Sequence, residues 1–381
     1  MLDSVHLRLL VGQVNPLPAP RPLLDALESV EVEVHDVGQS GFSLTFSIDK
    51  RSSLNTFFLL TNGQPLLFMR VVIVAVVNGV SNVLMDGVIT NNRIAPGDKG
   101  SNSTMTLMGT DLTTLMDLSA FTGRPHPATS AEARVSQILS KYQSYGVKPQ
   151  VIPSVWQYVP PKTEQVPVHK GTDLAYVQTL AREAGYVFYI EPGPALGSST
   201  GYWGPQKKVG PVQPALSCDM DAYTNVERMS FSFEQRKNRM PTLINYQFET
   251  GDSKPIQLPD TTLLNPELGQ VPPATINLQS QDSSPYRPDL AKKPLPLSQA
   301  AGLSKAADDK EAVSCSGGLD VTRYGTVLKA RQLVGVRGAG VVFDGLYYVK
   351  DVTHKIKRGE YRQDFTLTRN GLVSTVPTVT P

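Results

Sequence analysis

The side chains in this sequence best suited to bind a metal or to act as acid–base catalysts are its five histidines, which are far apart along the chain. Zinc enzymes commonly place two histidine ligands on one helix face, in spacings such as H-x-x-H or H-E-x-x-H. No pair of histidines here has such a spacing. We therefore interpret them as ordinary surface or strand residues and predict no metal site. The five are His6, His35, His126, His169 and His354.

Two other patterns resemble catalytic motifs but lack the required context. Ser40 lies in the segment GQSGF, which does not have the flanking G-x-S-x-G pattern of a nucleophile elbow. Residues 335–340 read GVRGAG, which is not in the G-x-G-x-x-G order of a dinucleotide site, and no strand-to-helix context surrounds them. We predict a turn before a strand at Ser40 and a loop at 335–340.

Two acidic pairs are the remaining candidates for acid–base or cation chemistry. No second cluster accompanies either pair in the sequence, so we interpret both as solvated turns. No catalytic residue, cofactor-binding residue or metal ligand is therefore predicted, and we do not expect an enzyme. The pairs are Asp219 with Asp221 and Asp308 with Asp309.

The composition describes a folded protein of more than one domain. A chain of 381 residues exceeds what one core usually organises, and 40% hydrophobic residues with 30 Gly and 30 Pro suit strands and turns. The net charge of +2 gives no global reason to expect nucleic acid. Cys218 and Cys315 form no C-x-x-C pair, so we expect neither a disulfide framework nor a zinc site, and a reducing cytoplasm fits.

No targeting or membrane-spanning segment is expected. The stretch that begins at Met1 has no basic region followed by an apolar core, so we predict no signal peptide. Residues 66–77 are mostly apolar, but they contain Arg70 and fall short of the roughly 20 residues that a spanning helix needs. We interpret this segment as a core strand and expect no direct membrane insertion.

The first region, residues 1–118, is predicted to be an antiparallel β-barrel domain. Residues 42–48 alternate apolar and polar side chains, which is typical of a strand with one buried face. Residues 69–77 are nearly all β-branched or apolar, as in a strand covered on both faces. Asn78 and Gly79 then indicate a turn.

The region 119–216 is predicted to be an α+β insertion. Thr129 and Glu132 have the spacing of a capping box, and Gly146 supplies a helix stop. The next region, 217–250, reads as strands that lead into a second barrel. Residues 251–297 carry nine prolines and little periodicity, so we predict an extended excursion. The last region, 298–381, is predicted to begin with a short helix and to form a second barrel.

Three segments of the sequence point to one family. Residues 172–190 read TDLAYVQTLAREAGYVFYI, a helix that ends at a glycine and an aromatic strand. Residues 344–370 contain DGLYYVKDVTHKI and FTLTRN, and residues 109–115 read GTDLTTL. These segments resemble phage late control protein D and the hub portion of valine-glycine repeat proteins of type VI secretion. The residues that carry the resemblance as scaffold are Asp173, Leu180, Gly185, Tyr186, Phe188, Gly345, Tyr348, Val349, His354, Gly359 and Tyr361.

The resemblance implies a mainly β fold with two tail-tube-like barrels in each chain. It implies a homotrimer whose ring meets a hexameric inner tube, or a tube-initiator protein, on one side and a trimeric spike on the other. Only residues 373–381 follow Leu372, so we expect the spike to be a separate protein. Other baseplate subunits would be further partners, and no cofactor or nucleic acid is expected. The particle would assemble in the cytoplasm of a bacterium or of a phage-infected cell.

Two alternatives stay open beside the hub of a phage tail, an extracellular injection system or a type VI machine. One is another tail or baseplate subunit with the tube fold, such as a tube-terminating or distal tail protein. The other is a cell-wall hydrolase carried on the tail.

The charge distribution suggests an assembly surface. Residues 321–370 hold ten basic and four acidic side chains, whereas residues 1–120 hold seven basic and eleven acidic ones. We hypothesise that these opposite charges help to dock neighbouring subunits or the tube. The alternative is that the charges are spread over solvated faces. The residues assigned to this possible interface are Lys355, Lys357, Arg358 and Arg362.

Overall fold

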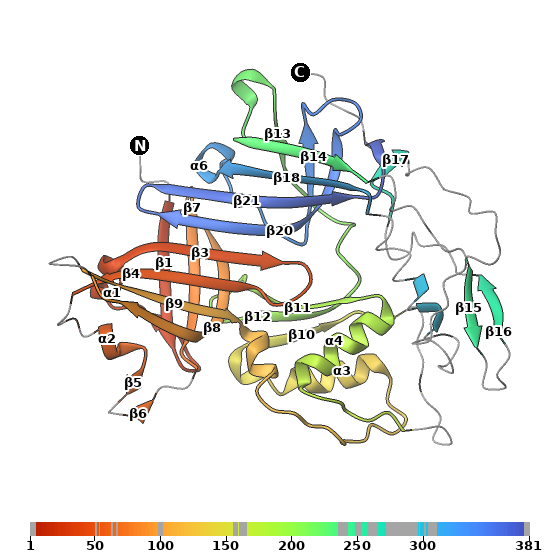
Figure 1. The fold of residues 1–381 in the computed structure, drawn as a ribbon, viewed down its shortest axis with the longest axis horizontal. Helices are drawn as coiled ribbons and strands as arrows, with labels where there is room; N and C mark the ends of the chain where they lie inside the picture. The colour runs from red at the N-terminus through yellow and green to blue at the C-terminus, as the bar shows by residue number, and fades with distance from the viewer. Residues whose placement is uncertain are drawn as a thin grey trace.

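The computed structural model shows a mainly β protein with an α+β insertion, as predicted from the sequence (Figure 1). The described residues are 5–49, 52, 54–61, 64–65, 68–97, 102–154, 159, 166–234, 243–247, 253–257, 266–271, 296, 298–300, 302–303 and 311–376.

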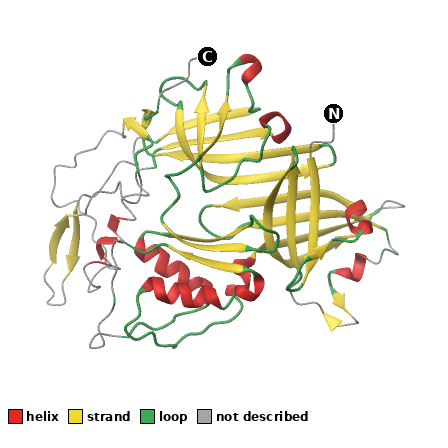
Figure 2. Ribbon diagram, turned by 180° about the vertical axis from the view of Figure 1, so that it is seen from behind, coloured by secondary structure: helices red, strands yellow, loops and turns green. Residues whose placement is uncertain are grey.

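The N-terminal half consists mostly of antiparallel strands that curve into a barrel-like wall (Figure 2). Its elements are β1 (Val5–Gly12), β2 (Leu17–Pro18), α1 (Arg21–Ala26), β3 (Leu27–His35), β4 (Gly41–Ile48), α2 (Leu54–Phe57), β5 (Leu60–Thr61), β6 (Gln64–Pro65), β7 (Arg70–Val77), β8 (Val80–Ala95), β9 (Ser103–Asp111) and the 3-10 helix η1 (Leu112–Met116). The strand order is β1-β7-β8-β9-β4-β3.

The burial of the strands in this half agrees with the prediction from their hydrophobic patterns. Strand β4 alternates between buried and half-buried residues, so its apolar side chains cover one face of the core. All residues of β7 are buried, as the continuous β-branched run predicted. Asn78 and Gly79 both have positive φ, at 50° and 80°, and form the tight turn between β7 and β8.

The C-terminal half contains a second set of paired strands. Its elements are β13 (Val212–Ser217), the 3-10 helix η3 (Asp221–Tyr223), β14 (Arg228–Phe233), β15 (Leu243–Gln247), β16 (Ser253–Gln257), β17 (Gly269–Val271), β18 (Val313–Asp320), α6 (Val321–Tyr324), β19 (Leu333–Arg337), β20 (Gly345–Lys357), β21 (Glu360–Arg369) and β22 (Leu372–Ser374). The main strand order is β13-β19-β20-β21-β18-β14.

The two halves have the same strand order when the six main strands of each half are numbered along the chain. These are β1, β3, β4, β7, β8 and β9 in one half and β13, β14, β18, β19, β20 and β21 in the other. In each half the first strand is followed across the sheet by the fourth, fifth, sixth, third and second. They differ at the first strand, because β1 runs antiparallel to β7 whereas β13 runs parallel to β19. The sequence predicted two similar barrels from pattern alone, and the shared order agrees with that prediction. The domain boundaries themselves stay predictions.

Strand β20 joins the halves into one sheet. Its first residues, 345–348, pair with β19, and its later residues, 351–357, pair with β3 of the N-terminal half. A register shift between Val349 and Asp351 separates the two stretches. Because of this bulge, Val349 and Val352 both face the core, where they are buried. Thirteen of the described strands of the two halves therefore form one sheet, and its buried side chains belong to one shared hydrophobic core.

The insertion has its own small sheet and its own core. Its elements are the helices α3 (Ala131–Ser140), η2 (Gln143–Tyr145) and α4 (Asp173–Ala184) and the strands β10 (Val147–Val151), β11 (Val187–Pro192) and β12 (Ser199–Gly204). The sheet order is β10-β12-β11, and α3 and α4 lie together on one face of it (Figure 1). Val88, Leu112 and Leu115 of the N-terminal half belong to the same core cluster, so the insertion packs directly on that half.

The helix ends agree with the prediction for α4 and correct it for α3. Helix α4 is capped by Thr172, whose hydroxyl accepts from the Ala175 N–H, and Gly185 ends it with φ 70°. Helix α3 is capped by Ser130 and not by Thr129. The predicted capping box is therefore wrong, because the Glu132 carboxylate accepts a hydrogen bond from the Ser154 N–H and Thr129 donates to a preceding carbonyl.

Two glycine assignments also change. Residues 335–337 of the expected loop belong to strand β19, and only the glycines at 338 and 340 lie in the turn that follows. Gly345 is not in a hairpin turn but is the first residue of β20. Gly345 has φ 128°, a backbone conformation that residues with a side chain rarely adopt, and a Cβ there would also lie 2.8 Å from Oγ of Ser374 and 2.9 Å from Nη1 of Arg369. Gly359 does form the predicted turn, between β20 and β21, with φ 76°.

The proline-rich segment 251–297 lies mostly outside the described residues, so the predicted excursion stays a prediction there. Within it, 253–257 forms β16 and 269–271 forms β17. Residues 298–300 and 302–303 are helical, in agreement with the short helix predicted after 297.

Candidate assembly surfaces

The residues assigned to a possible interface all lie on one hairpin, formed by β20 and β21. Lys355 and Arg362 are cross-strand partners on its outer face, while Lys357 and Arg358 lie beside its turn. All four are exposed. The turn places Arg358 where Nη2 donates to the Asp25 carbonyl at 2.8 Å. The fold thus gathers the four residues, as the hypothesis requires, and the hypothesis itself stays a prediction.

Much of the positive charge on this hairpin is balanced within the chain. Lys355 Nζ lies 2.8 Å from the Asp364 carboxylate, and Arg362 Nε lies 2.6 Å from the Glu360 carboxylate. The pairing of β20 with β3 also places Lys355 opposite Glu31. The acidic N-terminal half and the basic segment therefore meet first inside one molecule. Of the four residues assigned to the interface, Lys357 and Arg358 form no ion pair with a described residue and remain for an outside partner.

Two of the ten basic residues of segment 321–370 do not contribute to any surface. Arg331 and Arg369 are 2% and 0% exposed. Arg369 donates from Nη1 to the Asp344 carbonyl and from Nη2 to the Val342 carbonyl, both at 2.8 Å. Counting charges along the sequence overstated the surface charge because it could not separate buried guanidinium groups from exposed ones.

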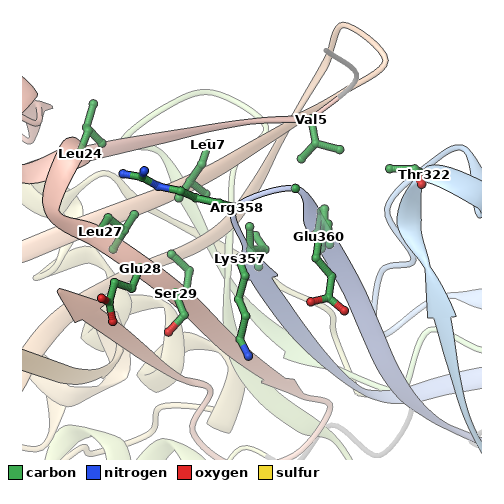
Figure 3. Close-up of a pocket in the computed structure, with 14 residues that line it drawn as sticks. Val5, Leu7, Leu24, Leu27, Glu28, Ser29, Thr322, Lys357, Arg358 and Glu360 are labelled. Atoms are coloured by element: carbon green, nitrogen blue, oxygen red, sulfur yellow. The ribbon is translucent and has the colours of Figure 1, made fainter. Parts of the chain in front are cut away.

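A groove of about 340 Å³ opens beside the hairpin turn (Figure 3). Apolar side chains of β1, α1, β3 and β20 line it, and charged groups stand at its rim. It lies where the two edges of the N-terminal sheet, β1 and β3, face each other without pairing. The lining includes Val5, Leu7, Leu24, Leu27, Val30 and Ile356.

A buried polar junction connects all three parts of the molecule around Arg331. The Arg331 guanidinium donates to the His35 carbonyl from Nε at 2.9 Å and from Nη2 at 2.6 Å, and to Ser40 Oγ at 3.2 Å. Its Cζ lies 3.8 Å from the ring centre of Tyr189 in the insertion. Ser40, which lies before β4 as predicted, also donates its N–H to the Asp111 carboxylate at 2.9 Å. Burial raises the pKa of the Asp111 carboxyl.

Asp36 belongs to the same junction and is 1% exposed. Its carboxylate accepts a 2.8 Å hydrogen bond from Gln206 Nε2, and its N–H donates to the Lys350 carbonyl at 3.0 Å. Burial raises the pKa of Asp36 from 3.8 to about 6, although nearby Lys350 lowers it.

The insertion is anchored to the N-terminal half by a buried ion pair. Arg70 and Asp86 form two hydrogen bonds, of 2.7 Å from Nε and 2.6 Å from Nη2, with side chains 2% and 1% exposed. Ser199 Oγ of the insertion donates to Asp86 at 2.9 Å, and Arg70 also donates to the Gly197 carbonyl at 3.1 Å. The sequence showed Arg70 only as an interruption of an apolar strand.

The family-motif residues of the insertion act as scaffold. The buried Asp173 carboxylate accepts from Lys141 Nζ at 2.9 and 3.0 Å and from the Tyr142 hydroxyl at 2.9 Å. Tyr186 packs edge-to-face on the fully buried Trp203, with ring centres 4.8 Å apart. The remaining motif residues here, Leu180, Gly185 and Phe188, belong to the core or end the helix.

The motif residues of the closing hairpin are also interior. His354 is fully buried, and its Nδ1 lies 2.8 Å from the Tyr361 hydroxyl and 3.2 Å from Gln363 Nε2. Burial lowers the pKa of His354 to about 3, so the ring is neutral at pH 7. Tyr348 and Val349 are buried on the same strand. The contacts of His354 with Tyr361 and Gln363 join β20 to β21 near the hairpin turn.

The structure brings together two histidines that the sequence kept apart. His126 and His169 lie with ring centres 6.1 Å apart and both pack on Tyr176. Burial is the main cause that lowers the pKa of both rings, and Arg134 adds to the effect on His126. They meet because residues 121–126 and 167–171 run side by side through main-chain hydrogen bonds. No sequence spacing indicated this. His6 and His35 lie on strands, as expected.

The other chemical candidates do not assemble into a site. Asp219 and Asp221 are exposed with φ near 49° and 48°, in agreement with solvated turns, whereas Asp308 and Asp309 lie outside the described residues. Among the described residues no three His, Cys, Asp or Glu side chains gather closely enough to hold a metal ion. None of the helices in the described part is long and apolar enough to cross a membrane.

Comparison with solved structures identifies the fold. A tail protein from Neisseria meningitidis MC58 matches with TM-score 0.62 and 13% identity, over 99% of this chain and 100% of that one. The prophage MuSo2 43 kDa tail protein from Shewanella oneidensis matches with TM-score 0.56 and 11% identity, over 96% and 98%. The E. coli c3393 protein matches with TM-score 0.50 and 11% identity, over 93% and 77%. No protein-family model and no curated protein matches the sequence.

The chain therefore has the fold of phage tail proteins. More narrowly, it shares that fold with c3393, which is described as a component of the type VI secretion system with structural similarity to the T4 bacteriophage tail proteins gp27 and gp5. The resemblance to baseplate hub proteins drawn from the three sequence segments is confirmed at the level of the fold.

Proposed function

We propose that the protein is the baseplate hub of a contractile phage tail or of a related injection system, and that it works as a homotrimeric ring between the inner tube and the spike. One observation carries this proposal: the same strand order occurs twice in one chain, and the two sheets are joined through β3 and β20. Three copies would present six similar sheets around one axis. Such a ring matches a hexameric tube on one side and a threefold spike on the other.

The fold likeness supports a structural role in a tail, because the matched proteins are tail and type VI secretion proteins. In this role the chain acts through symmetry and surface complementarity and has no catalytic step or cofactor. Its partners are the tube or tube-initiator protein, the spike and other baseplate subunits. Assembly takes place in the bacterial cytoplasm, or in the phage-infected cell, as part of a tail-like particle.

The mass of the protein in solution tests the proposal. Light scattering coupled to gel filtration should give about 124 kDa, three times the chain mass of 41.4 kDa. Averaged electron-microscope images should show a closed ring with threefold symmetry and six similar lobes. Each contact between neighbours should bury more than about 2,000 Å², as obligate interfaces do. A monomer at micromolar concentration would contradict the hub.

The same measurement separates the alternatives. A tube-terminating or distal tail protein with the same fold would form a sixfold ring of about 248 kDa, six times 41.4 kDa. A tail-associated hydrolase would release soluble fragments from purified cell walls, whereas the hub should release none.

A further inference from the structure

The N-terminal sheet ends at β1, and part of the outer edge of this strand is open. Along one side β1 pairs with β7 over its whole length, but on the other side only Leu10 and Val11 pair with β2. The Leu9 carbonyl also faces this outer side, where it accepts from the Ala19 N–H at 2.8 Å. Alternate residues of a strand turn their main-chain groups to the same edge.

Val5 and Leu7 therefore direct their N–H and C=O groups to the same outer side as Leu9. Within the described part of the chain these groups have no hydrogen-bond partner on that side. In a closed barrel β3 would pair with them. Here β3 is already paired on both sides, with β4 and with β20. The joining of the two halves thus leaves the seam of the first barrel open, and an open sheet edge is a template for another strand.

The groove of Figure 3 lies along this open edge. The side chains of Val5 and Leu7 line one side of the groove, and those of Leu24 and Leu27 line the opposite side. The turn of the β20-β21 hairpin closes one end. Its volume of about 340 Å³ is in the range of sites that take a small apolar group. If another strand paired with the open edge of β1, its side chains on the barrel side would enter this groove.

Two cations, Lys357 and Arg358, and two acids, Glu28 and Glu360, stand at the rim of the groove. Arg358 has donated one N–H to the Asp25 carbonyl, and the rest of its guanidinium has no carboxylate partner among the described residues. Lys357 is also free of an ion pair there. On the acidic side, Glu360 is already paired with Arg362, which leaves Glu28 as the acid without a partner in the described part of the rim. A guanidinium fork is suited to binding a carboxylate with two hydrogen bonds.

We propose that an extended segment of a partner protein adds to β1 as an edge strand in this groove, with apolar side chains at alternate positions and a carboxylate that binds Arg358. Main-chain hydrogen bonds to Val5 and Leu7 supply affinity, and the apolar groove and Arg358 supply selectivity. The site is complete within one chain. Binding at this site can therefore be tested whether or not the protein forms a trimeric ring.

Binding of a labelled probe peptide tests the proposal. The probe is an acetylated, amidated peptide that alternates threonine and valine and ends in glutamate, followed by fluorescence anisotropy at low salt. The native chain should bind it with a Kd below about 1 mM. Arg358→Glu should weaken binding about tenfold, because an attraction becomes a repulsion. Lys148→Glu, on the exposed surface of β10, is the matched control and should leave Kd unchanged.

Two further arms separate strand addition from adventitious binding. A probe methylated on alternate main-chain nitrogens should not bind, because it cannot donate to the β1 carbonyls. Hydrogen exchange of the region 5–12 should slow when the native probe binds. Exchange of 228–233 should not change, although β14 also has one open edge among the described strands. The proposal would be overturned if the native chain did not bind the probe, or if the methylated probe bound as well as the native one. It would also be overturned if the Arg358→Glu variant bound the probe as tightly as the native chain, or if the probe protected β14 instead of β1.

Discussion

Charged side chains make their polar contacts in two very different regions of this protein. At the buried junctions, Arg70 meets Asp86 and Arg331 meets carbonyl and hydroxyl oxygens, with exposures of about 2%. On the outer face of the β20-β21 hairpin, Lys355 and Asp364 form a pair of similar length with side chains 50% and 34% exposed. Both regions use charged groups that form hydrogen bonds, but the contacts are buried in the first region and exposed to water in the second. Burial makes the loss of one partner expensive, whereas water and salt replace the surface contact at little cost.

The largest effect is expected at Asp86. Asp86→Ala leaves the Arg70 guanidinium charged, buried and without its carboxylate, which should cost about 3–5 kcal/mol in the free energy of unfolding. Urea unfolding measures it. The double variant Arg70→Met with Asp86→Leu removes both charges and should recover most of the loss. A single variant within about 1 kcal/mol of the native chain would remove the distinction between the two regions.

A smaller loss is expected at Arg331. Arg331→Met keeps a long side chain but removes three hydrogen bonds to His35 and Ser40 and the stacking on Tyr189. It should cost about 2–3 kcal/mol, since the partly buried His35 carbonyl and the buried Ser40 hydroxyl lose their charged donor. Hydrogen exchange should speed up in β3 and β11, which Arg331 connects, and stay unchanged in α3. Uniform acceleration everywhere would show that Arg331 does not act as a local junction.

Asp36 should give an effect of the opposite sign. Its pKa in the folded protein is raised to about 6, mainly by burial, so the folded state binds more protons than the unfolded state between about pH 4 and 6. The contribution of Asp36 to stability is therefore greatest at low pH and is lost as pH rises through 6. Asp36→Asn should stabilise the protein by about 2 kcal/mol at pH 7 and by little at pH 4. Unfolding curves at both pH values measure the difference, and an equal effect at both would contradict the burial of a charged carboxylate.

The smallest effect is expected on the hairpin surface. Lys355→Ala should change the free energy of unfolding by less than about 1 kcal/mol, and 0.5 M salt should remove most of that change. The ion pair raises the pKa of Lys355, mainly through its hydrogen bond to Asp364. Because the side chain is exposed, this shift implies little stability. A loss as large as that of Asp86→Ala would mean that the hairpin surface is covered in solution.

The local elements of the fold could be predicted from sequence because their causes are local. The alternation along β4, the continuous apolar run of β7, the turn at Asn78 and the helix from Thr172 to Gly185 all depend on residues within a few positions of one another. One error was also local: helix α3 is capped by Ser130, one position after the expected Thr129.

What only the tertiary structure decided are the contacts between residues far apart in the chain. Arg331 binds the His35 carbonyl across 296 positions, and Ser199 reaches Asp86 across 113. The pairing of β3 with β20 placed acidic and basic strands side by side and left part of the outer edge of β1 open. The β20-β21 hairpin turned part of the expected docking charge into internal ion pairs. The sequence by itself determined which segments become strands and helices, since periodicity and capping are short-range. It did not determine which strands pair or which charges are buried, because those depend on chain segments that meet only in the folded state.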